Sequence, residues 1–130
     1  MINLENDGYN DVKLVKKTYV CTIILSIRFV TVMKQTIINK MQAFFPTYPV
    51  EKAWIFGSYA RGEETRKSDI DIMVRFDRNA TVTLIDYARI MNNLSDLLRK
   101  KVDLVQEGTL YKFAQESVER DKILVYERNN

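Results

Sequence analysis

Hydrophobic and polar positions along the chain predict a mixed α and β domain that follows residue 32. Residues 34–45 repeat apolar positions with a helical period, and Pro46 ends that helix. Further strands and helices are predicted at residues 50–56, 69–76, 83–98, 102–106 and 110–120. Residues 123–126 predict a short terminal strand or the tail of the last helix. The order α-β-β-α-β-α predicts an α+β (α/β) fold, in which helices pack on one face of a small mixed sheet.

The two later helices carry signals for their ends and for their buried faces. Thr83, followed three residues later by Asp86, predicts a capping box at the start of the first of them. Three cations close that helix at residues 99–101, and its expected buried residues are Leu84, Ala88, Met91, Leu94 and Leu98. Thr109 is expected to cap the last helix, whose inward residues are predicted to be Leu110, Phe113, Ala114 and Val118.

Residues 1–32 form an N-terminal extension to the domain predicted at residues 33–130. The apolar stretch at residues 19–33 is interrupted by Arg28 and is shorter than the ~20 apolar residues that a membrane-spanning helix needs. The acidic and polar start also differs from a signal peptide, which begins with basic residues. Two interpretations remain open: an extension ahead of a natural start at Met33, or an extra element that packs on the domain or on a partner.

A pair of aspartates opens the strand predicted at residues 69–76. In an extended strand Asp69 and Asp71 share one face, whereas Ile70 and Ile72 point to the other. Two carboxylates ~4 Å apart repel by roughly 4 kcal/mol at an effective dielectric constant of about 20. A shared proton, an arginine or a divalent cation would relieve that repulsion, and oxygen ligands suit Mg²⁺ or Mn²⁺.

The turn that ends the preceding strand is formed by Gly57 and Ser58. Glycine lets the backbone approach a ligand closely. Exposed N–H groups after it, at the start of a short helix, favour a phosphate. The stretch therefore predicts a phosphate cradle and a metal clamp on neighbouring strands.

The spacing of these residues resembles a known signature. Gly57-Ser58, ten residues and then Asp69-Ile70-Asp71 is similar to the signature of the nucleotidyltransferase superfamily that includes DNA polymerase beta. The fuller strings at residues 57–62 and 68–72 resemble its smallest members, the minimal nucleotidyltransferases or MNT domains. The resemblance covers about residues 33–127 and implies the palm-like nucleotidyltransferase fold.

The resemblance implies a role for each polar residue of this stretch. Asp69 and Asp71 would bind two Mg²⁺ ions, for which Mn²⁺ can substitute. Asp103, between apolar neighbours on the third strand, matches the family's third carboxylate if that strand pairs beside the second. It would help to bind the catalytic ion and would accept the proton of the incoming hydroxyl; three carboxylates can hold two cations about 3.5–4 Å apart. The predicted nucleotide-binding residues are Gly57, Ser58, Arg61 and Ser68.

Structural alternatives stand beside several of these roles. Ser58 would hydrogen-bond the β- or γ-phosphate, but it can also simply cap the short helix. Arg61 either steadies the triphosphate or pairs with Glu63 or Glu64. Ser68 is a turn residue if it does not contact the nucleotide. The basic run at residues 99–101 is interpreted as the end of a helix rather than as a nucleic-acid site.

Composition narrows the chemistry further. The chain has no histidine, which excludes a Ser-His-Asp triad and a Cys-His dyad. Its single cysteine, Cys21, excludes an intrachain disulfide and fits a reducing cytoplasm. A net charge of +3 suits a polyanionic substrate without requiring nucleic acid, and no membrane partner is expected.

The predicted function is a Mg²⁺-dependent nucleotidyl transfer. The enzyme would move a nucleoside monophosphate, AMP from ATP, onto a hydroxyl and release pyrophosphate. The resemblance implies an antitoxin that acts on a tyrosine of a small helical HEPN-domain toxin. Two alternatives remain: a non-catalytic binding module that neutralises its partner by contact, and adenylylation of a small molecule such as an aminoglycoside.

Overall fold

The computed structural model describes residue 28 and residues 31–129, and the described residues fall into two units that divide between Thr36 and Ile37. In the first unit, residues 31–36 are helical, and the hydroxyl of Thr36 donates to the carbonyl of Val32 at 2.9 Å. The two interpretations of the N-terminal extension concern residues that lie, with few exceptions, outside the described part of the chain. No helix in that part is long and apolar enough to cross a bilayer.

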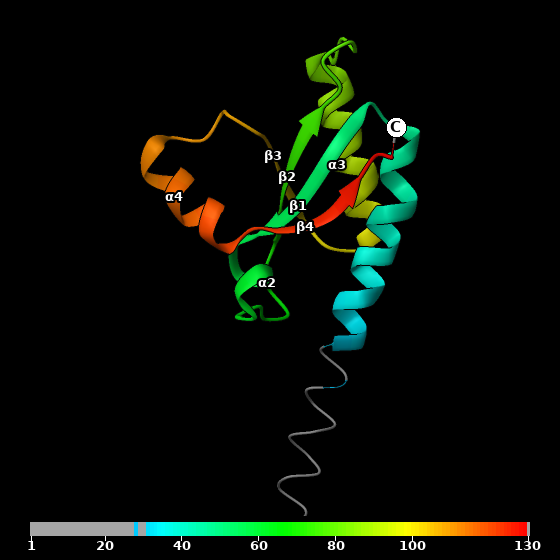
Figure 1. Ribbon diagram of the computed structural model, residues 1–130. Coiled ribbons are helices and arrows are strands. Elements are labelled where there is room, and N and C mark those ends of the chain that lie inside the picture. Colours follow the sequence, from blue (N-terminus) through cyan, green and yellow to red (C-terminus); the bar gives the residue numbers. More distant parts are fainter. Residues whose placement is uncertain (1–27, 29–30, 130) are drawn as a thin grey trace, which may run out of the picture. The chain divides into compact units, whose positions relative to one another are not determined.

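The second unit is built on a four-stranded mixed sheet (Figure 1). In the order of the sheet, the strands are β3 (Val102–Gln106), β2 (Ile70–Phe76), β1 (Val50–Phe56) and β4 (Ile123–Glu127). The central strand β1 runs antiparallel to both β2 and β4, whereas β2 and β3 are parallel. The predicted mixed sheet is confirmed, and residues 123–126 form a strand rather than a helix tail.

Four helical segments of the second unit accompany the sheet. Residues 37–44 are helical and lead into a 3₁₀ turn, η1 (Phe45–Thr47), at Pro46. The others are α2 (Gly57–Arg61), α3 (Leu84–Leu98) and α4 (Lys112–Asp121). The capping box is confirmed, because Thr83 Oγ1 accepts from the N–H of Asp86 and Asp86 Oδ2 accepts from the N–H of Thr83. The helix α3 ends at Arg99, whose φ of 52° is left-handed.

The larger hydrophobic core lies between one face of the sheet, residues 37–44 and α3. Side chains of β1 and β2 alternate between the two faces, and the members on this face are fully or almost fully buried. They include Ile55, Ile72 and Val74, which pack with Ile90, Leu94 and Leu98 of α3. This face therefore has the predicted arrangement, with helices over the sheet.

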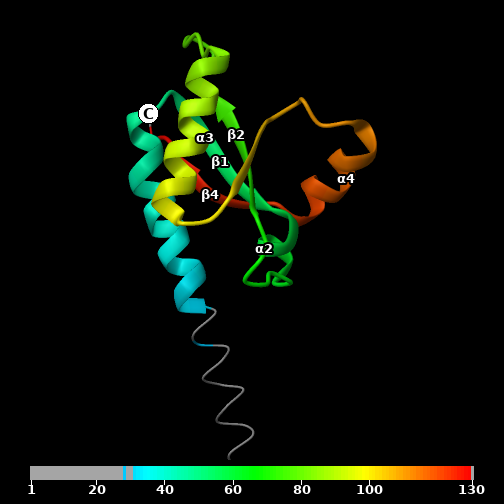
Figure 2. The same ribbon diagram turned by 180° about the vertical axis from the view of Figure 1, so that it is seen from behind.

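A second, smaller cluster lies on the opposite face under α4. Trp54 of β1 pairs with Met73 of β2, and both pack against Val118 of α4. Figures 1 and 2 show α3 and α4 on opposite sides of the sheet. The expectation that the helices share one face thus holds for residues 37–44 and α3, but not for α4. The reason is that Trp54 and Met73 point away from the larger core and need apolar cover of their own.

Two side chains that were expected inside are on the surface. Leu84 and Phe113 are each 84% exposed. Leu84 is the first residue of α3 and precedes the buried stripe that begins at Ile90. The helix α4 starts later than predicted, after Tyr111, because Thr109 Oγ1 donates to the carbonyl of Gln106 in a turn instead of capping the helix.

Candidate active site

The turn after β1 brings the backbone directly against a carboxylate. Gly57 opens α2 with a φ of 67°, a left-handed value that residues with a side chain rarely adopt. A Cβ at this position would lie 2.2 Å from Oδ2 of Asp71 and 3.1 Å from its Cγ. The glycine of the predicted cradle is therefore also what makes room for the Asp71 side chain.

Three aspartates come together at adjacent positions of the sheet. Asp69 immediately precedes β2, Asp71 lies within it, and Asp103 is the register partner of Asp71 across the parallel β2–β3 pair. Val102 and Leu104 belong to the larger core, so Asp103 points out of the opposite face. The pairing of the third strand beside the second, on which the convergence of these carboxylates depended, is confirmed.

Lys101 places a positive charge between two of these carboxylates. Its Nζ donates to Asp69 Oδ2 at 3.3 Å and lies 3.9 Å from Asp103 Oδ1. The hydrogen bond to Asp69, and then the charges of Asp69 and Asp103, raise the pKa of the Lys101 ammonium. This lysine therefore joins the two strands at the acidic site.

Asp71 is the half-buried carboxylate at the centre of the group. Burial raises its pKa, and the neighbouring charges of Asp103 and Asp69 raise it further, whereas Arg61 acts in the opposite direction. The ionised form of Asp71 is thus less favourable in the folded protein than in the unfolded chain. A further cation beside Asp71 would relieve this repulsion.

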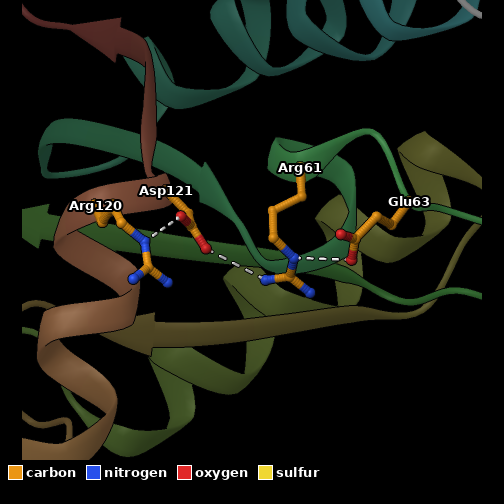
Figure 3. A network of polar contacts seen from close by, with 4 residues as sticks. All are labelled: Arg61, Glu63, Arg120 and Asp121. Atoms are coloured by element: carbon orange, nitrogen blue, oxygen red, sulfur yellow. Dashed lines mark hydrogen bonds and ion pairs between the residues drawn. The ribbon is translucent and has the colours of Figure 1, made fainter.

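Arg61, at the end of α2, contacts two carboxylates that come from different parts of the chain (Figure 3). Its Nε donates to Glu63 Oε2 at 2.9 Å, and one of its terminal nitrogens lies 3.5 Å from Oδ2 of Asp121. Asp121, the last residue of α4, also accepts from Nε of Arg120 at 3.1 Å. The expected pairing of Arg61 with Glu63 is found, and the contact with Asp121 links α2 to α4.

A cavity of about 340 Å³ opens beside this network. Aromatic and small apolar side chains line much of it, together with one hydroxyl and the Arg61–Asp121 pair: Phe56, Gly57, Arg61, Phe113, Ala114, Ser117, Val118 and Asp121. Because Gly57 touches Asp71, the cavity adjoins the acidic group. Its size falls in the range of small-molecule sites.

The two serines of the signature each accept a hydrogen bond from a backbone N–H group nearby in the chain. The carbonyl of Ser58 accepts from the N–H of Glu63 at 2.9 Å, which helps to close α2. Ser68 Oγ accepts from the N–H of Thr65 at 2.8 Å, so Ser68 is a turn residue. Contacts of Ser58 and Ser68 with a nucleotide remain predictions.

A known family matches most of the chain. The family described as "Polymerase beta, Nucleotidyltransferase" matches residues 39–130. This chain belongs to the polymerase beta nucleotidyltransferase family. The matched range contains the Gly-Ser turn and all three aspartates, and it confirms the resemblance on which the prediction of a nucleotidyltransferase enzyme was based.

One relative of this nucleotidyltransferase is a protein of Methanocaldococcus jannaschii that is provisionally named a protein adenylyltransferase. It is 42% identical over 79 residues, which are 60% of this chain and 79% of the relative. Its name agrees with the family description in indicating a nucleotidyltransferase enzyme.

Three solved structures resemble the fold of this nucleotidyltransferase. A toxin–antitoxin complex with AMP-PNP is 25% identical, with a TM-score of 0.60, and covers 70% of this chain and 73% of its own. A protein provisionally identified as a minimal nucleotidyltransferase is 30% identical, with a TM-score of 0.56, and covers 74% and 92%. A tri-AMPylated HEPN toxin of Shewanella oneidensis in complex with MNT antitoxin matches at 22% identity and a TM-score of 0.56, covering 73% of each chain, and shows the fold alone.

The donor set of this nucleotidyltransferase fits Mg²⁺ or Mn²⁺ in its chemistry. Carboxylate oxygens are ligands that both ions prefer, and the absence of a side chain at Gly57 lets the Asp71 carboxylate occupy the position that a Cβ would fill. Among residue 28 and residues 31–129, no three acidic or thiol side chains are arranged closely enough to hold a metal as they stand. Metal binding would therefore require the aspartate side chains to move.

Two residues of the site were missed by sequence reasoning. The sequence placed Lys101 at the end of a helix. Lys101 directly precedes β3, however, and lies two residues before Asp103, so the two side chains share one face. Asp121 belongs to no recognisable motif, and it lies 60 residues from Arg61 in the chain, so no local spacing could predict their contact. Only the packing of α4 beside α2 brings Asp121 to the arginine.

Proposed function

We propose that this nucleotidyltransferase uses Mg²⁺ to transfer AMP from ATP to a hydroxyl of a partner protein, and that the partner is a HEPN-domain toxin. The proposal rests on one observation: Gly57 lies against the Asp71 carboxylate, and Asp71 is the register partner of Asp103 across the β2–β3 pair. The relative named as a protein adenylyltransferase supports AMP and a protein acceptor. The toxin–antitoxin complex with AMP-PNP supports an antitoxin role.

The proposal assigns a role to the Gly57-Ser58 turn, to Arg61 and to the three aspartates. Ser58 and the backbone after Gly57 hold the β- and γ-phosphates. Arg61 turns from Glu63 and Asp121 toward the triphosphate; its side chain is 41% exposed, and the bound nucleotide would replace both carboxylate partners. Asp69, Asp71 and Asp103 would hold two Mg²⁺ ions, which, when bound, supply charge neutralisation at the α-phosphate and at the leaving group.

The transfer step needs an acceptor of the hydroxyl proton. Asp103 takes that proton as the hydroxyl oxygen attacks the α-phosphorus. A bond forms between this oxygen and phosphorus, the bond to the pyrophosphate oxygen breaks, and pyrophosphate leaves with the electron pair. Positioning and electrostatic stabilisation supply most of the rate enhancement in such reactions.

ATP binding should require a divalent cation. Isothermal titration is expected to detect ATP binding in the presence of Mg²⁺ or Mn²⁺ and a loss of at least about tenfold in affinity in EDTA, because the carboxylates and the triphosphate repel each other without the ions. Equal affinity in EDTA would contradict the metal clamp.

The acceptor can be identified by mass. Incubation with ATP and the product of the adjacent gene should add the mass of AMP to that partner, and peptide mapping should locate it on a tyrosine. Tight association without a mass change would favour neutralisation by contact. Transfer to an aminoglycoside with an unmodified partner would favour a small-molecule enzyme.

Replacing Asp103 with asparagine should lower turnover more than ATP affinity. The variant keeps a neutral oxygen ligand but can no longer accept the hydroxyl proton, and general-base catalysis contributes about 10²- to 10⁴-fold. Single-turnover labelling measures the rate of transfer, and ATP titration measures the affinity, so the two losses can be compared. A variant with weakened ATP binding and an unchanged rate of transfer would show that the role of Asp103 is assigned wrongly.

A further inference from the structure

Lys101 is held at the acidic site by its backbone as well as by its side chain. The N–H of Ile70 donates to the carbonyl of Lys101 at 2.9 Å, which fixes the start of β3 beside the start of β2. Asp69 and Lys101 each precede the register pair Ile70–Val102, so they occupy neighbouring positions. The ammonium then lies 3.3 Å from Asp69 and 3.9 Å from Asp103.

The ammonium lies between two of the three carboxylates to which the proposed function assigns metal ions. A lysine ammonium is a compact point charge on a flexible stem, whereas a guanidinium is a rigid planar fork. The Lys101 side chain is 71% exposed, so it can leave the site without disturbing the core. Its present position is also consistent with the absence of a preformed metal cluster among the described residues.

We propose that Lys101 is an exchangeable internal counterion of the acidic site. Its ammonium holds Asp69 and Asp103 together while no divalent cation is bound, and it leaves when the cation binds. Lys101 is thus a positioning residue, which preserves the paired arrangement of β2 and β3 at the site and sets how readily a cation enters it. The entry of the cation is the part that rests on the proposed function; the counterion role does not.

Binding of Mn²⁺ without nucleotide tests the exchange directly. Lys101→Met should bind Mn²⁺ at least about fivefold more tightly than the natural protein, because a unit charge at ~4 Å, even in bulk water, changes an interaction by about that factor. Lys101→Arg should bind no more tightly than the natural protein, because the fork still pairs with the carboxylates. Electron paramagnetic resonance of free Mn²⁺ measures all three affinities.

Lys100→Met is the matched control. Lys100 is the preceding residue and loses the same charge, but its ammonium donates to the carbonyl of Arg66 at 3.2 Å and lies over the Tyr59 ring. Its removal should change Mn²⁺ affinity by less than about twofold, as expected for an exposed charge outside the site. If Lys100→Met and Lys101→Met increased Mn²⁺ affinity equally, the effect would be due to net charge alone. That result would overturn the proposal.

Thermal unfolding gives a readout that does not depend on activity. In EDTA, Lys101→Met should lower the melting temperature by about 2–4 °C, and Lys101→Arg should restore it. In saturating Mn²⁺ the deficit should disappear, because the cation replaces the ammonium. A melting temperature equal to that of the natural protein in EDTA would overturn the counterion role.

The two proposals fail in different ways. If the natural protein and Asp69→Asn/Asp71→Asn show the same negligible affinity for Mn²⁺, the metal clamp of the proposed function and the exchange are both wrong. The melting temperatures in EDTA then still decide whether Lys101 serves as the counterion. If Mn²⁺ binds and Lys101→Met leaves its affinity unchanged, the proposed function stands and the exchange is overturned.

Discussion

Replacing Asp69 and Asp71 together with asparagine is expected to lower AMP transfer at least about a thousandfold while the protein stays folded. The pair supplies the charge that would hold both metal ions, and loss of one electrostatic contact to a transition state already costs about 10²- to 10³-fold. Incorporation of label from α-labelled ATP measures the loss. Asp96→Asn, an exposed aspartate of α3, is the matched control and should retain full labelling.

Stability distinguishes this result from simple unfolding. The pKa of Asp71 is raised in the folded protein, first by burial and then by Asp103 and Asp69. The ionised carboxylate therefore destabilises the fold above its raised pKa, and this penalty disappears as the pH falls below the ordinary pKa of an aspartate. In EDTA at pH 7, the double variant should stay folded, because relief of the Asp71 penalty offsets loss of the Lys101–Asp69 contact. Unchanged labelling, or a variant that is unfolded at pH 7, would contradict the assignment.

Gly57→Ala should give the second largest loss. The new Cβ would lie 2.2 Å from Asp71 Oδ2, and the φ of 67° would be strained by about 1–2 kcal/mol for a residue with a side chain. Relief of the clash requires movement of the Asp71 carboxylate or of the turn, and either displaces the proposed cradle from the metal ligands. We expect about a hundredfold loss of AMP transfer or more, because small misplacements of reacting groups have effects of that size.

Gly108→Ala is the control for backbone strain in this experiment. Gly108 has a φ of 86°, so the substitution introduces the same kind of left-handed strain. No atom outside its chain neighbours lies within 4 Å of its Cβ position, so no clash is added. The variant should melt at a lower temperature but transfer AMP at the natural rate. If Gly57→Ala and Gly108→Ala lose activity equally, contact with Asp71 is not the reason for the glycine.

The site could be predicted in part because its chemistry is concentrated in a short stretch. The Gly57-Ser58 turn and the Asp69-Asp71 pair lie within 15 residues and include a period-two alternation that defines a strand face. Asp103 could be added because a single carboxylate in an apolar strand must leave by the face opposite the core. For Arg61 the sequence left contact with the triphosphate and pairing with Glu63 or Glu64 open, and the structure shows the pairing with Glu63.

The errors arose where tertiary packing outweighed local pattern. Phe113 was expected inside because it fits the helical period of α4, yet the face of α4 that meets the sheet is set by Trp54 and Met73. Leu84 fits the period of α3, yet it lies at the helix start beyond the packed stripe. A periodic pattern indicates that a helix has an apolar stripe, but not how far along the helix the sheet extends.

The amino-acid sequence by itself determined most of the elements, the capping box at Thr83, the family signature and the chemistry that carboxylates can perform without histidine. These features depend on residues that are close in the chain, where spacing alone sets which side chains share a face. The tertiary structure alone decided that α4 covers the second face of the sheet, that Asp121 reaches Arg61, and that Lys101 lies between Asp69 and Asp103. Except for Lys101 and Asp103, these contacts join residues far apart in sequence, and their geometry follows from strand register and helix packing, which no local pattern specifies.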